Sequence, residues 1–236
     1  MVPPGNYNKM PGHFTFYTEE IKNNQAVFSE SESKHMVQVL RYSQGDIIEF
    51  TDGKGTIFKG SLLEANRKSV VAKVEEKTTS DIPDTVLVIG ILKSSDRMET
   101  VVEKCVELGI KTIHLMPSEN SERKKVNLDK LHKTAIAAMK QSHGNYLPSI
   151  EVSSIQEIIQ EYGDKLMLAH CRDGFKALPK VLNRDSIVCV GPEGDFSEKE
   201  IDLFKAAKAT EISLGKRILR AETAAIAAIT LANLNA

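Results

Sequence analysis

Residues 186–234 read SIVCVGPEGDFSEKEIDLFKAAKATEISLGKRILRAETAAIAAITLANL, and this stretch decides the fold class. Its first strand, SIVCVG, is continuously apolar, which is typical of strands buried on both faces of a parallel sheet. A helix, the strand EISLG and an alanine-rich helix follow. Further strands of this kind precede it, TVLVIGIL (85–92), TIHLMP (112–117) and KLMLAH (165–170), with helical patterns between them. This alternation predicts an α/β domain with a mostly parallel sheet.

The N-terminal part has a different pattern. Residues 14–78 contain short strands, with a hairpin signal at Asp52-Gly53 and alternating apolar and polar residues in SVVAKVEEKT. These features predict a small, mainly antiparallel barrel or sandwich. The polar segment SDIPD (80–84) is the best linker in the chain. We therefore divide the chain into a β domain, 13–79, and an α/β domain, 80–236.

Composition excludes several classes of protein. The 236 residues suit two domains, and a net charge of -1 argues against binding nucleic acid through bulk positive charge. No apolar run approaches the roughly 20 residues of a membrane span, and the N-terminus lacks a signal-peptide core. The three cysteines form no CxxC pair, and no histidine has HExxH spacing. We expect a cytoplasmic protein with no metal and no membrane partner.

The first candidate site follows the strand SIVCVG. Ligands of α/β sheets bind beyond the carboxyl ends of strands, and Gly191 and Gly194 allow close backbone approach there. Ser197 and Glu200 form a capping box for the next helix. A plain strand-to-helix turn explains the same residues equally well. Neither GxGxxG nor a P-loop occurs, so NAD and nucleoside triphosphates lack their usual signature.

The second candidate site lies at the start of the last helix. Arg217 and Arg220 precede it, although a positive charge opposes the helix dipole at that end. They therefore indicate an anionic or polar ligand. The alternative is a salt bridge from Arg220 to Glu222 or Glu193.

The third candidate is the most basic stretch, SENSERKK, after the strand TIHLMP. A solvated surface is the usual explanation of such a run, but its place at a strand end favours contact with phosphate.

These motifs resemble one family. VGPEGDFSEKE with SLGKRILRAETAAIAA is similar to the paired signature of ribosomal RNA small subunit methyltransferase E. KSSDRMETVVEKCVELGI, SENSERKK, AAMKQSHGNYLP and HMVQVLRYSQGDIIEFTDGKG resemble further parts of this family, in the same order. The resemblance covers residues 14–236.

The resemblance implies a SPOUT-type methyltransferase domain with a trefoil knot, preceded by a PUA-like RNA-binding domain. It implies S-adenosylmethionine as cofactor, a homodimer, and methylation of uracil N3 in 16S rRNA, within the 30S subunit. The alternatives are a SPOUT enzyme for another RNA, such as tRNA, and a non-catalytic RNA-binding ribosome-assembly factor. An unrelated nucleotide-dependent α/β enzyme would need a glycine signature that is missing.

The resemblance and the chemistry together suggest roles for particular residues. Arg220 or Arg123 would stabilise the uracil anion, and Glu193 or Glu222 would accept its proton. The cofactor-binding residues would be Leu168, Ala169, His170, Val190, Gly191, Pro192, Gly194, Leu214, Gly215, Ile218 and Leu219. The RNA-binding residues would be Arg41, Lys93, Arg97, Lys124, Lys125 and Gln141.

The chain departs from the family at two points. The usual GPEGG reads GPEGD here, which places Asp195 where the family has glycine. The arginine that often follows Gln-Ser is absent, so Lys140 or His143 would have to replace its phosphate contact. Residues 1–12 have no counterpart in the family.

Overall fold

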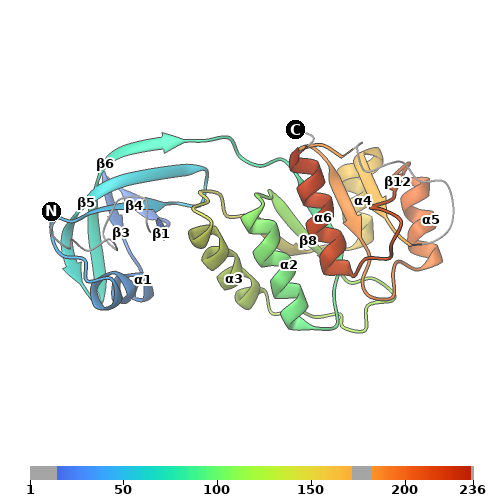
Figure 1. Cartoon of the computed structure of the whole chain (residues 1–236), viewed down its shortest axis with the longest axis horizontal. Helices are drawn as coiled ribbons and strands as arrows, with labels where there is room; N and C mark the ends of the chain where they lie inside the picture. The colour runs from blue at the N-terminus through green and yellow to red at the C-terminus, as the bar shows by residue number, and fades with distance from the viewer. Residues whose placement is uncertain (1–14, 172–181, 235–236) are drawn as a thin grey trace. The chain divides into compact units, whose positions relative to one another are not determined.

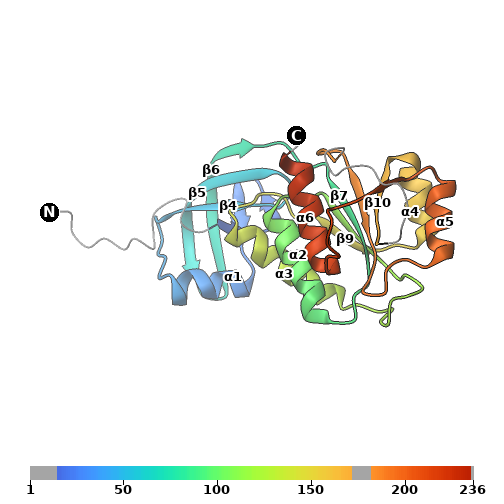
Figure 2. The ribbon, with the colours of Figure 1, turned by 45° about the vertical axis from the view of Figure 1, so that its right-hand side comes forward.

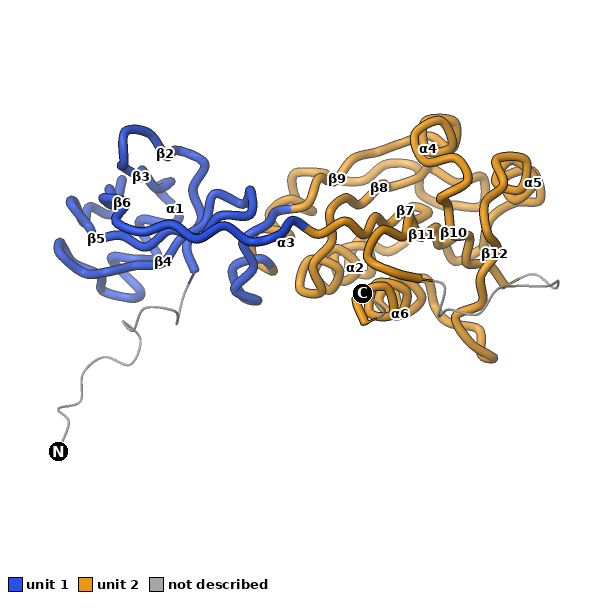
Figure 3. The backbone as a smooth tube through the Cα atoms, turned by 90° about the horizontal axis from the view of Figure 1, so that it is seen from above, with its two compact units in different colours: residues 1–82, 139–147 blue, residues 83–138, 148–236 orange. Residues whose placement is uncertain are grey.

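The computed structural model describes residues 15–171 and 182–234 of the chain (Figure 1). Contacts between residues divide it into two units (Figure 3). The first is Met1–Ile82 with Met139–Leu147, and the second is Pro83–Ala138 with Pro148–Ala236. The domain boundary expected from the sequence, at residue 80, instead places residues 139–147 in the second domain. In the structure this segment hydrogen-bonds to the first unit, where Gly55 N donates to Asn145 O over 2.8 Å.

The first unit is a six-stranded sheet with two short helices. Its strand order is β1-β4-β5-β6-β3-β2, and all pairs except β1–β4 are antiparallel. The strands are β1 (Thr15–Tyr17), β2 (Glu20–Lys22), β3 (Gln25–Val27), β4 (Ile47–Thr51), β5 (Thr56–Asn66) and β6 (Ser69–Thr79). The helices are α1 (Glu30–Lys34) and the π-helix η2 (His35–Val39). The expected mainly antiparallel β domain is therefore present.

Aromatic side chains form the core of this unit. Phe50 stacks on Phe58 with ring centroids 5.4 Å apart, and Phe28 meets Phe50 edge to face. Such aromatic pairs stabilise the fold by more than the burial of their apolar area alone. Lys140 and His143, the two candidates for a phosphate contact, are engaged within this unit. Lys140 pairs with Glu32, and the His143 ring lies 3.2 Å from the Thr15 hydroxyl.

The second unit is an α/β structure with a fully parallel sheet. Its strand order is β12-β10-β11-β7-β8-β9. The strands are β7 (Val86–Gly90), β8 (Thr112–Met116), β9 (Ser149–Val152), β10 (Leu166–Ala169), β11 (Ile187–Val190) and β12 (Thr210–Ile212). Strand β9 was not expected, because it lies at the sheet edge and only one of its four residues is buried.

Helices cover both faces of this sheet. They are α2 (Ser95–Glu107), α3 (Leu128–Gln141), α4 (Ile155–Tyr162), α5 (Glu198–Ala206) and α6 (Ala221–Leu234), with a 3₁₀ turn, η3 (Gly163–Lys165). Figure 2 shows α2 and α6 side by side, and Figure 3 shows α4 and α5 on the opposite face. The capping box of Ser197 and Glu200 is present at α5, as predicted.

The sheet positions loops at its carboxyl edge. Strand β11 lies between β10 and β7, so the chain leaves β7 and β11 in opposite directions along the sheet. Such a reversal is where open α/β sheets bind ligands. The trefoil knot stays a prediction, because the connection from β10 to β11 includes 172–181, outside the described residues. Residues 1–12 also lie outside them.

Among the described residues, no helix is long and apolar enough to cross a membrane. The same residues contain no group of three or more histidine, cysteine, aspartate or glutamate side chains that could hold a metal ion.

Candidate functional site: a cavity at the carboxyl edge of the parallel sheet

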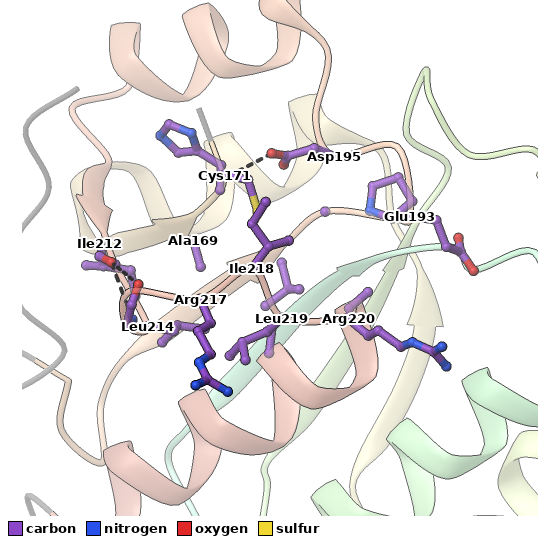
Figure 4. Close-up of a pocket in the computed structure, with 18 of the residues that line it drawn as sticks. Ala169, Cys171, Glu193, Asp195, Ile212, Leu214, Arg217, Ile218, Leu219 and Arg220 are labelled. Carbon is purple, nitrogen blue, oxygen red and sulfur yellow. Dashed lines mark hydrogen bonds between the residues drawn. The ribbon is translucent and has the colours of Figure 1, made fainter. Parts of the chain in front are cut away.

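A cavity of about 660 Å³ lies beyond the carboxyl ends of β10, β11 and β12 (Figure 4). Three connections line it, after Ala169, after Val190 and after Ile212, and the start of α6 completes the wall. The three strands are neighbours or next neighbours in one parallel sheet, so their ends meet at the same edge. Segments far apart in the sequence thereby form one site.

Most residues that the sequence suggested for the cofactor line this cavity. They are Ala169, His170, Val190, Gly191, Pro192, Leu214, Gly215, Ile218 and Leu219. Leu168 and Gly194 do not. Leu168 is fully buried in the core beside α4 and α5, because alternate residues of β10 face opposite sides of the sheet. Gly194 lies against Asn120.

The lining combines apolar and cationic groups. Ile218 is 84% exposed, and Figure 4 shows it near Leu219 and Cys171. Lys216, Arg217 and Arg220 also line the cavity. A ligand with an apolar ring and polar substituents suits such a surface.

Arg220 is one of the cations that line the cavity. It precedes α6, and its carbonyl accepts the first helical hydrogen bond from Ala224 N at 2.8 Å. Its guanidinium forms no hydrogen bond or ion pair with the residues that the structure describes. The salt bridge that would have explained Arg220 is absent, since Glu222 and Glu193 bind Arg97 instead.

Arg97 connects three segments around the cavity. From the first turn of α2, its guanidinium reaches Glu193 Oε1 at 2.7 Å, and its Nε reaches Glu222 Oε2 at 3.0 Å. Glu193 also accepts the backbone N–H of Lys93. Partial burial raises the pKa of Glu222, but hydrogen bonds from Arg97 and the charges of Arg97 and Arg220 lower it overall. Arg97, a candidate for RNA, is therefore occupied by two carboxylates.

We expect Arg97→Met to lower the free energy of unfolding by about 2 kcal/mol, because it leaves two partly buried carboxylates without their cation. Urea unfolding measures the change. Lys104→Met is the matched control, because Lys104 also pairs with two carboxylates, Glu103 and Glu107, on the exposed side of the same helix. Its loss should cost much less stability, because ion pairs between solvent-exposed side chains contribute little. Equal losses in the two variants would contradict the connecting role of Arg97.

Histidine and cysteine side chains also differ in their settings. His170 lines the cavity, and its buried ring lies 2.6 Å from Glu211 of β12, a partner that the sequence did not suggest. Cys171 is exposed at the cavity. Cys105 and Cys189 are buried in α2 and β11, and burial raises the pKa of the Cys105 thiol to about 12 and that of Cys189 further.

Two side chains fix the loop after β8. The buried carboxylate of Glu200 caps α5 and also accepts hydrogen bonds from Ser118 Oγ and Glu119 N, both at 2.9 Å. Asn120 donates to the carbonyls of Gly194 and Asp195 at 3.1 Å. These hydrogen bonds join the loop after β8, which begins the basic stretch SENSERKK, to the loop after β11, which we call the glycine loop (191–195).

Family models match both units of the chain. An RNA methyltransferase domain matches residues 79–233, and an RNA methyltransferase PUA domain matches residues 28–75. The chain belongs to this RNA methyltransferase family. The resemblance found in the motifs is confirmed, and so is a mixed α/β methyltransferase domain that follows a PUA domain.

Similar proteins span nearly the whole RNA methyltransferase chain. A probable rRNA-methyltransferase from Porphyromonas gingivalis is 32% identical, with a TM-score of 0.82, over 92% of this chain and 95% of that one. Ribosomal RNA small subunit methyltransferase E from Neisseria gonorrhoeae, solved bound to S-adenosyl methionine, is 26% identical, with a TM-score of 0.79. The match covers 92% of this chain and 94% of that one. The protein of that name from Bacillus subtilis is 29% identical over 84% of this chain and 86% of its own length.

The other candidate residues of this RNA methyltransferase do not line the main cavity. Arg123 lines a second cavity of about 200 Å³ with Asn127 and Lys130. Lys93 pairs with Glu122 on the surface, and Lys124 donates to the carbonyls of Ser118 and Glu119. Lys125 is exposed. Arg41 and Gln141 are exposed residues of the first unit.

Proposed function

We propose that this chain transfers the methyl group of S-adenosylmethionine to N3 of one uridine in the 16S rRNA of the small ribosomal subunit. The observation that carries the proposal is the cavity at the ends of β10, β11 and β12. At its edge lies Arg220, whose guanidinium pairs with none of the residues that the structure describes. The relative solved with S-adenosyl methionine, similar over 92% of this chain, supports the choice of cofactor.

The lining fits this cofactor. Leu214, Ile218 and Leu219 offer apolar contact to an adenine ring, and the backbone groups of the three connections offer hydrogen bonds to its polar edge. Gly191 and Gly215 allow the backbone to approach the ligand. When bound, S-adenosylmethionine supplies a methyl group on a positively charged sulfur, which is already activated for transfer.

The chain must therefore prepare the other reactant. N3 of uracil is a weak nucleophile while it carries a proton, and loss of that proton leaves negative charge on O2 and O4. Arg220 stabilises this charge through its guanidinium, as preorganised donors do in other enzymes. Arg123 lies in the second cavity and is the weaker candidate.

A carboxylate accepts the proton from N3. Glu193 lines the cavity, whereas Glu222 does not. The pKa of Glu222 is lowered, which makes this carboxylate a poor proton acceptor. We therefore assign proton acceptance to Glu193, and a supporting role to Glu222 through Arg97.

The RNA must present the Watson–Crick edge of the base, so the target uridine is unpaired or turned out. Lys93, Lys125 and Arg41 supply phosphate contacts, and activity should fall steeply with salt. A homodimer, a trefoil knot, a 30S subunit as substrate and a place in the cytoplasm belong to the same proposal. They are supported by the family resemblance.

The test is methyl transfer from labelled S-adenosylmethionine to 30S subunits that lack the modification, followed by digestion and mass spectrometry of the nucleosides. We expect N3-methyluridine at one site of 16S rRNA. Free 16S rRNA and tRNA serve as parallel substrates. Methylation of tRNA instead would replace the proposed substrate, and failure to bind S-adenosylmethionine would favour a non-catalytic assembly factor.

A further inference from the structure

Asp195 adopts a backbone conformation that favours glycine. Its φ is 59°, in the left-handed region, where aspartate is tolerated at some cost. The residue ends the turn Pro192–Asp195, in which Asp195 N donates to Pro192 O at 2.9 Å. The side chain that this chain carries there needs an explanation beyond the turn.

The carboxylate of Asp195 joins two walls of the main cavity. Its Oδ2 accepts the backbone N–H of Cys171 at 2.8 Å (Figure 4). Its Oδ1 accepts the N–H of Phe196 at 2.8 Å. Cys171 belongs to the connection after β10, and Asp195 to the connection after β11. Both residues line the cavity. Charge-assisted hydrogen bonds of this kind are stronger than neutral ones.

Gly191 accommodates this arrangement. A Cβ atom at Gly191 would lie 2.9 Å from Asp195 Oδ1, so the carboxylate rests directly against the backbone of a cavity-lining residue. The bridge therefore positions the backbone groups of both connections at once.

We propose that Asp195 is a positioning residue, which holds the Cys171 end of the β10 connection in place and thereby sets the cavity wall that binds S-adenosylmethionine. This inference rests on the proposed function. If Asp195 only completed the turn, glycine would suit the position better, because its backbone adopts a positive φ without strain.

Substitution by glycine distinguishes these two roles. Asp195→Gly relieves the left-handed backbone but removes both acceptors, so stability should hold or rise while cofactor affinity falls. Asp195→Asn tolerates the same backbone and keeps one of the two acceptors, so it should lie between wild type and Asp195→Gly. Lys208→Gly is the matched control, since Lys208 has a φ of 64° in the same unit and does not line the cavity.

Calorimetric titration with S-adenosylmethionine, thermal melting and steady-state kinetics test the proposal. We expect the Kd and the KM for S-adenosylmethionine to rise about tenfold in Asp195→Gly, equivalent to ~1.4 kcal/mol. They should rise about threefold in Asp195→Asn and stay unchanged in Lys208→Gly, while kcat and the KM for RNA change little. Wild-type affinity in Asp195→Gly would overturn the inference.

A measurement without cofactor separates this inference from the proposed function. Hydrogen exchange at the Cys171 amide should be at least about tenfold faster in Asp195→Gly than in wild type. If wild type bound no S-adenosylmethionine, the proposed function would fail. An unchanged exchange rate at Cys171 would overturn the positioning role by itself.

Discussion

Arg220→Ala should lower kcat for methyl transfer by about 10² to 10³, the effect typical of losing one preorganised donor to a developing oxyanion. The Kd for S-adenosylmethionine should change by less than about threefold, because the cofactor contacts that we propose come mainly from backbone groups and apolar side chains. Single-turnover transfer with saturating 30S subunits measures the chemical step, and calorimetry measures cofactor binding.

Two variants control this result. Arg220→Lys keeps a positive charge without the planar pair of donors and should recover only part of the rate. Arg184→Ala removes an exposed arginine of the same unit that does not line the cavity and should behave as wild type. A near-normal kcat in Arg220→Ala would exclude the proposed stabilisation of the uracil anion.

Gly90→Ala should abolish measurable cofactor binding and lower the free energy of unfolding by about 3 kcal/mol. Gly90 ends β7, and a Cβ atom there would lie 2.4 Å from Pro192 Cδ and 2.6 Å from Pro192 N. Pro192 lines the cavity, and neither its ring nor its backbone can move aside without displacing the glycine loop. Urea unfolding and calorimetry with S-adenosylmethionine measure the two effects.

Gly144→Ala is the control for this substitution. A Cβ atom at Gly144 would lie no closer than 3.4 Å to Met139, its nearest contact. Its loss of stability should be small, and cofactor affinity should not change. If Gly90→Ala bound S-adenosylmethionine as tightly as Gly144→Ala, the contact between β7 and Pro192 would not determine the shape of the site.

Local patterns predicted much of this fold. The continuous apolar runs at β7, β8, β10 and β11 identified a parallel sheet, and the capping box fixed the start of α5. These features depend on residues close together in the chain. The edge strand β9 could not be predicted in this way, because its single buried residue gives no pattern of apolar and polar positions.

Pairings between distant residues could not be predicted in the same way. Arg97 lies 125 positions from Glu222, and no periodicity shows that the two residues meet. The sequence offered Arg220 as the partner of Glu222, yet the structure leaves Arg220 exposed. Leu168 shows a different limit. Ala169 and His170 line the cavity, as the sequence suggested, but Leu168 points into the core of the domain.

The unequal settings of the three cysteines make the native chain suitable for labelling. Cys105 and Cys189 are buried with raised pKa values, so their thiols are poor nucleophiles at neutral pH. Cys171 is exposed at the wall of the cavity. An environment-sensitive fluorophore with a maleimide group would therefore attach at Cys171 without any engineered site. Its emission would report, in real time, when a ligand enters or leaves the cavity.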